Sequence, residues 1–182
     1  LQRLRYPRGA GGWLLLGAAL PAASVALAVG IARRAGDAAP FTPSGAIPLT
    51  ILLQLLTGAV GEELGWRGFL LPRLGERFGP RAAAWGMATL WSSWHIAGFF
   101  FPGTPQHMMP PLLNLLFIVF FGVFLAGIFN RTGESVLATM LAHLSLNIGL
   151  AMGGVRLSSL WLWWTLVAVF GAVALAITIA SR

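Results

Sequence analysis

The chain has 182 residues, of which 57% are hydrophobic and only 9% are charged. Soluble domains carry about 25% charged residues, so this composition excludes an ordinary soluble domain and predicts a membrane protein. All 12 basic residues behind the net charge of +7 are arginines, and because they lie singly or in small groups between apolar stretches, they exclude a nucleic-acid-binding face.

About six apolar stretches approach the roughly 20 residues that a helix needs to cross a bilayer. The segments between them contain the prolines, glycines and charged residues that interrupt helices. The sequence therefore predicts an all-α fold, a polytopic transmembrane helical bundle of about six spanning helices that forms one domain over residues 1–182. In chain order, the predicted spans are residues 13–32, 47–71, 82–101, 112–129, 135–152 and 158–180.

The arginines also predict the orientation of the bundle, since the cytoplasmic loops of membrane proteins are enriched in basic residues. The N-terminal segment, the predicted 72–81 and 130–134 loops and the C-terminus together contain eight arginines, whereas the other three loops contain three. We therefore expect both termini in the cytoplasm and the protein in the cell (inner) membrane, surrounded by lipid.

Few ionisable side chains lie within the predicted spans. A charged residue at the bilayer centre costs about 2.5–3.5 kcal/mol, so such residues face the bundle interior or a hydrated cavity and are candidates for function. Glu63 and Arg67 are four residues apart and can form a structural ion pair on one helix face, whereas Glu62 has no such partner. The complete set is Glu62, Glu63, Arg67, His95 and His143.

Polar residues on three different spans are predicted to meet at one depth. His143 and Asn147 share a helix face at a four-residue spacing, as do Trp91 and His95. At a rise of 1.5 Å per residue, Glu62, His95, His143 and Asn147 lie about 12 to 20 Å inside their spans. Three separate helices would thus bring polar groups to one layer near the middle of the bilayer, which predicts a shared site.

Two kinds of chemistry fit such a site. A carboxylate in an apolar pocket can act as a general base toward water, while imidazole and amide groups donate hydrogen bonds to the oxyanion that forms at a carbonyl. Alternatively, Glu62, His95 and His143 can hold a divalent metal ion such as zinc with one position open. The chain has no cysteine and no HExxH motif, so thiolate metal sites and the common metalloprotease helix are excluded.

Three ordered motifs give the sequence a resemblance to a known family. The segments are EELGWR at residues 62–67, WSSWH at 91–95 and HLSLN at 143–147. They resemble the EExxxR, FxxxH and HxxxN motifs of the CAAX protease and bacteriocin-processing (CPBP, or Abi) intramembrane endopeptidases, with Trp91 in place of the usual phenylalanine. The resemblance covers residues from about 47 to 150.

This resemblance implies an integral-membrane endopeptidase that hydrolyses the peptide bonds of a peptide or membrane-protein substrate. It implies that Glu62 is the general base, that His95 helps to hold the water, and that His143 and Asn147 form the oxyanion site. Glu63, Arg67 and Trp91 would support these residues. The resemblance leaves open whether a metal ion or Glu62 alone activates the water.

Two other classes of function compete with this interpretation. A non-catalytic membrane scaffold, or an immunity or partner protein, could retain the protease fold, but the intact set of Glu62, His95, His143 and Asn147 favours an enzyme. A proton-coupled transporter is expected to have more polar lining, broken helices and a pair of repeats, and the sequence has none of these features.

Overall fold

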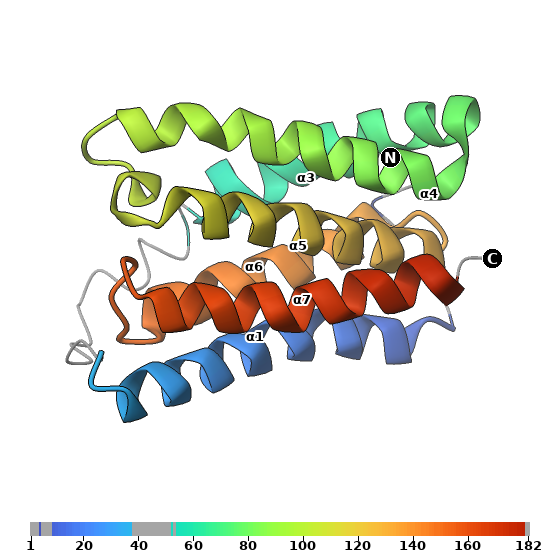
Figure 1. Cartoon of the computed structure of the whole chain (residues 1–182). Helices are drawn as coiled ribbons and strands as arrows, with labels where there is room; N and C mark the ends of the chain where they lie inside the picture. Colours follow the sequence, from blue (N-terminus) through green and yellow to red (C-terminus); the bar gives the residue numbers. More distant parts are fainter. Residues whose placement is uncertain (1–3, 5–8, 38–51, 53, 181–182) are drawn as a thin grey trace.

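The protein is a bundle of long helices whose axes run roughly parallel or antiparallel to one another (Figure 1). This computed structural model describes residues 4, 9–37, 52 and 54–180, and its regular elements are all helices, which confirms the all-α fold class. The α1 helix packs on α6 and α7, while α5 packs on α4 and α7. The five long helices are α1 (Gly11–Arg34), α4 (Leu71–Trp94), α5 (Pro111–Arg131), α6 (Val136–Met152) and α7 (Leu160–Ala180).

Three of these helices, α1, α5 and α7, are long and apolar enough to cross a membrane, judged by length and composition over the described residues. They correspond to the predicted spans 13–32, 112–129 and 158–180. The α6 helix is also apolar but has only 17 residues, and α4 carries four charged residues between positions 73 and 81. About six spans is therefore more than the described residues supply, and residues 47–51 and 53 of the predicted second span lie outside them.

The predicted 72–81 loop is wrong, because most of this segment is helical. Pro72 lies in the first turn of α4, where a proline is tolerated since the missing N–H has no essential intrahelical partner. The chain changes direction later, at Gly79, whose φ of 78° and ψ of 162° are not helical. Glycine adopts this positive φ without the steric cost that a Cβ would bring, and Pro80 follows directly.

The segment that carries the adjacent glutamates is not a regular α-helix. A short α-helix, α3 (Gly61–Gly65), lies between two π-helical segments, η2 (Gln54–Val60) and η3 (Trp66–Leu70). Turns of π-helix are rare and occur frequently at functional sites, because the wider turn changes the direction in which side chains point. Glu62 and Glu63 thus lie in the one α-helical turn between two distorted segments.

The α5 helix forms the centre of the core and sets how closely α4 approaches it. Phe121 and Phe124 of α5 are 1% and 0% exposed. A Cβ on Gly122 would lie 2.7 Å from the Cβ of Ala88, so only glycine allows α4 and α5 to pack at this distance. This close contact positions Trp91, one turn after Ala88 on α4, in the bundle interior, where it is 2% exposed.

A tight turn connects α5 to α6. The Thr132 hydroxyl donates to the carbonyl of Ile128 at 2.7 Å, and Gly133 and Glu134 both have positive φ. Ser135 then caps α6, because its hydroxyl accepts a hydrogen bond from the Ala138 amide at 3.3 Å. This turn lies where the sequence predicts the 130–134 loop, and it starts the helix that carries His143.

Candidate active site

Glu62 points toward α4 rather than toward lipid. Its Oε2 atom accepts a hydrogen bond from the indole N–H of Trp91 at 2.6 Å, and the Glu62 side chain is half-buried. Hydrogen bonds to an ionised group are shorter and stronger than neutral ones, so this contact fixes the orientation of the carboxylate. One carboxylate oxygen is therefore held by Trp91.

The indole of Trp91 is the point at which the predicted site residues meet. The rings of His95 and His143 pack edge-on against it, with centroid distances of 5.5 and 5.4 Å. The guanidinium of Arg67 lies over the indole face, 4.3 Å from its centroid, in a cation–π contact. A single aromatic side chain thus contacts three ionisable groups and donates a hydrogen bond to a fourth, Glu62.

Glu63 forms a buried three-membered network. Its Oε1 atom is 2.8 Å from Nη1 of Arg67 and 2.9 Å from Nδ1 of His143, and the Glu63 and Arg67 side chains are both 0% exposed. The ion pair that the four-residue spacing predicts is confirmed. The contact with His143 was not predicted from the sequence. Because a carboxylate oxygen only accepts, Nδ1 of His143 carries a proton and Nε2 faces away from Glu63.

His95 stands at the end of α4 rather than in the middle of a longer span. The α-helix ends at Trp94, and His95 begins a 3₁₀ segment, η4 (His95–Phe100), so the predicted continuous span 82–101 is too long. Its Nδ1 atom donates to the Trp91 carbonyl at 2.9 Å, which leaves Nε2 as the nitrogen for another partner. The half-buried ring of His95 also interacts electrostatically with Glu62, Arg67 and His143.

Asn147 lies one turn after His143 on α6 and is half-buried. Because α6 is α-helical throughout, residues four apart point to the same side of the helix, as the sequence predicts. The role of Asn147 as an oxyanion donor stays a prediction.

The three residues of the predicted metal set all contact the side chain of Trp91. Within residues 9–37 and 54–180, no three His, Asp or Glu side chains are grouped closely enough to hold a metal ion. Glu62 is anchored through Oε2 and each histidine through Nδ1, so the atoms left to hold a zinc ion are Oε1 of Glu62 and the Nε2 atoms of His95 and His143. These atoms are ordinary zinc ligands, but the described residues do not group them as a metal centre, so no step below passes through a metal ion.

The sequence does not predict the contacts that join these groups across the bundle, nor the part that Phe121 has in them. The Trp91 indole N–H and the His143–Glu63 contact connect positions 29 and 80 residues apart. Phe121 of α5 also packs on both Trp91 and His143, with centroid distances of 6.2 and 6.0 Å. The only signal in the sequence is that a buried tryptophan needs an acceptor for its N–H.

Residues 44–149, more than half of the chain, match the family described as type II CAAX prenyl endopeptidase Rce1-like. The matched region contains α3, α4 and α5, most of α6 and all seven of the predicted site residues. This match confirms the family resemblance drawn from the three motifs. A search of curated proteins found no match to the chain.

Proposed function

The chain belongs to the Rce1-like type II CAAX prenyl endopeptidase family, a family of membrane proteases, and from this premise we propose that Glu62 activates the water that hydrolyses a peptide bond. The observation that carries the proposal is the position of Glu62. One oxygen of its carboxylate is fixed by Trp91 at 2.6 Å, and the half-buried side chain keeps Oε1 for a water molecule. A general base has to be both oriented and within reach of its proton.

His95 is proposed to orient the same water. Its Nδ1 proton is donated to the Trp91 carbonyl, so Nε2 of the neutral ring can accept a hydrogen bond from water. The edge-on contact of His95 with Trp91 keeps this ring beside the indole that binds Glu62. Both groups that handle the water are thus positioned by one tryptophan.

The proposed reaction starts when the water oxygen attacks the carbonyl carbon of the scissile peptide bond and its proton passes to Glu62. The oxyanion that forms is stabilised by His143 through Nε2 and by the Asn147 amide. Glu63 accepts a hydrogen bond from Nδ1 of His143, which orients the ring. When the C–N bond breaks, Glu62 returns its proton to the leaving amine, which restores the starting state of the enzyme.

The proposal is tested with purified protein in proteoliposomes and a quenched fluorescent peptide as substrate. Glu62→Gln keeps the shape of the side chain and removes the base, so the cleavage rate should fall by about 10²- to 10⁴-fold. Glu76→Gln is the matched control, because Glu76 is exposed on α4 and outside the Trp91 contacts. Full activity of Glu62→Gln would overturn the role of Glu62, and a folded wild-type protein that cleaves nothing would favour the scaffold alternative.

A further inference from the structure

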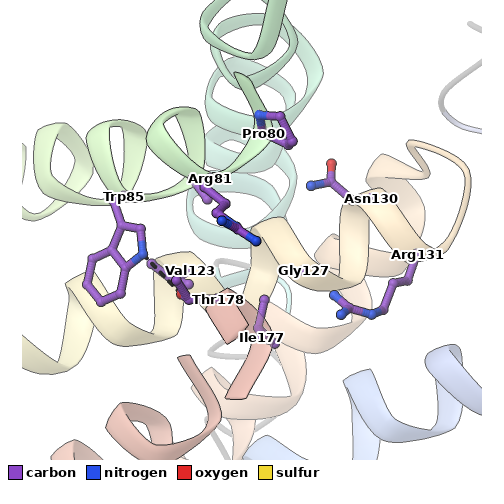
Figure 2. A pocket seen from close by; sticks show the side chains of 10 residues that line it. Pro80, Arg81, Trp85, Val123, Gly127, Asn130, Arg131, Ile177 and Thr178 are labelled. Atoms are coloured by element: carbon purple, nitrogen blue, oxygen red, sulfur yellow. Dashed lines mark hydrogen bonds between the residues drawn. The ribbon is translucent and has the colours of Figure 1, made fainter. Parts of the chain in front are cut away.

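A cavity lies at one end of the bundle and shares no residue with the Trp91 site. Its volume is about 310 Å³, and it lies where α4 resumes after Gly79 and where α5 and α7 end. Figure 2 shows Arg81 and Arg131 entering it from opposite sides, with Ile177 and Thr178 of α7 forming its floor. The proposed reaction does not use this cavity.

The cavity is positively charged and has no internal counter-charge. Arg81 is exposed and Arg131 is half-buried. None of the described residues that line the cavity is acidic, so neither arginine has a carboxylate within it. Arg131 is held in place by stacking on the Trp13 ring, with its guanidinium carbon 5.0 Å from the ring centroid. Two positioned guanidinium groups form a binding site for an anion, and phosphate suits their geometry.

The wall of the cavity is rigid and already satisfied in its hydrogen bonding. The Trp85 indole N–H donates to the Thr178 hydroxyl at 3.1 Å, which in turn donates to the Ala174 carbonyl at 2.7 Å. This chain of hydrogen bonds connects α4 to α7 beside the arginines (Figure 2). The donors that remain for a ligand are therefore the guanidinium groups of Arg81 and Arg131 and the side-chain amide of Asn130.

An apolar groove continues from the charged cavity. The groove has a volume of about 230 Å³ and shares Gly127, Arg131 and Ile177 with the charged cavity. Apart from Arg131, its lining is made of apolar side chains and glycine, including Leu16 of α1 and Val173 of α7. One ligand could thus place a polar head in the charged cavity and a hydrocarbon chain in the apolar groove, and the chain would meet no polar group other than Arg131.

We propose that Arg81 and Arg131 bind the phosphate headgroup of an anionic phospholipid whose acyl chain lies in this groove. The cavity lies at the ends of α5 and α7, where the apolar stretches of these helices stop. This places the cavity at the level of the lipid headgroups. Basic pockets between transmembrane helices bind such headgroups, and each nearby arginine strengthens the attraction. Inorganic phosphate shares the headgroup chemistry, but only a lipid also fills the groove.

The test measures lipid binding by the whole chain in a neutral detergent, with native mass spectrometry and thermal shift as readouts. The ligands are phosphatidylglycerol, phosphatidylcholine and inorganic phosphate. Arg81→Gln/Arg131→Gln is compared with Arg73→Gln/Arg77→Gln, which removes the same charge at two exposed positions of α4 outside the cavity. Phosphatidylglycerol should bind about 20- to 30-fold more weakly to the first double variant, or about fivefold per arginine, and unchanged to the second.

Three results would overturn the proposal. Equal weakening in both double variants would mean that overall charge, not the cavity, attracts the lipid. Equal affinity for phosphatidylcholine would exclude recognition of net charge. Inorganic phosphate that protects as well as phosphatidylglycerol does at equal concentration would assign the arginines to a free anion. If the first double variant does not fold, the single variants and Arg81→Lys/Arg131→Lys replace it, and the lysine pair should bind within about fivefold of wild type.

Discussion

Glu62 and Glu63 are neighbours in the sequence but belong to different environments. Glu63 is fully buried, and its Oε1 atom receives both Arg67 and His143. Glu62 is half-buried and receives the Trp91 indole on one oxygen. Successive residues on an α-helix point about 100° apart, so one glutamate faces α6 and the other faces α4. The same residue type thus serves as a structural counter-ion at one position and is available for chemistry at the next.

The comparison predicts that changes around Glu63 affect stability and changes around Glu62 affect turnover. The largest expected effect on stability is from Arg67→Ala. This substitution leaves the buried Glu63 carboxylate without its cation, which should lower the free energy of unfolding by about 3–5 kcal/mol. The measurement is thermal unfolding in detergent, with Arg73→Ala as an exposed control on α4. An unchanged melting temperature for Arg67→Ala would mean that the ion pair is not buried.

Asn147→Ala tests the proposed oxyanion site. Asn147 lies on α6, the helix that Glu63 contacts through His143. Removing one donor should lower kcat by about 10²- to 10³-fold while KM changes little, because the lost hydrogen bond forms in the transition state. Peptide cleavage in proteoliposomes measures both constants, and Asn130→Ala on α5 is the exposed control. An increase in KM alone would assign Asn147 to substrate binding.

Trp91→Phe separates the hydrogen bond to Glu62 from the ring contacts with the histidines. The phenyl ring keeps an aromatic surface but cannot donate to Glu62, so the carboxylate should lose its fixed orientation and kcat should fall by about ten- to a hundredfold. Trp164→Phe, at an exposed position of α7, should have no effect. Wild-type turnover in Trp91→Phe would show that the indole N–H does not position Glu62.

Chelation should have the smallest effect, because the proposed reaction has no step through a metal ion and no three His, Asp or Glu side chains of the described residues are grouped as metal ligands. Treatment with EDTA or 1,10-phenanthroline, followed by removal of the chelator, should leave kcat/KM unchanged. Loss of activity that zinc restores would instead support the metal interpretation of these three residues.

The parts of this structure that depend on local sequence could be predicted, and the parts that depend on long-range packing could not. In lipid, an apolar stretch of about 20 residues has to form a helix to satisfy its backbone groups, so α5 and α7 follow from composition. The Glu63–Arg67 pair follows from a four-residue spacing. Each of these predictions depends only on a stretch of fewer than about 25 consecutive residues.

The hydrogen bonds that organise the site have a different origin. His143 meets Glu63, and Trp91 meets Glu62, only because α4 and α6 both pack on α5 and α3 packs on α6. The π-helical segments beside α3 were not predicted either, since a periodicity of 3.6 residues was assumed throughout. A proline usually marks a helix end, which is why the sequence predicts a loop from Pro72. Pro72 instead lies in the first turn of α4, and this position follows from where the preceding π-helical segment ends, which the sequence does not show.

The most direct test of the central claim compares Glu62→Gln with Glu63→Gln, two identical chemical changes at adjacent positions, by measuring kcat and the melting temperature of each. Glu62→Gln should lower kcat by about 10²- to 10⁴-fold and leave the melting temperature within error of wild type. Glu63→Gln should lower the melting temperature, because Arg67 loses its counter-ion and Nδ1 of His143 loses a carboxylate acceptor. A Glu62→Gln protein that unfolds at a lower temperature but cleaves peptide at the wild-type rate would contradict the account.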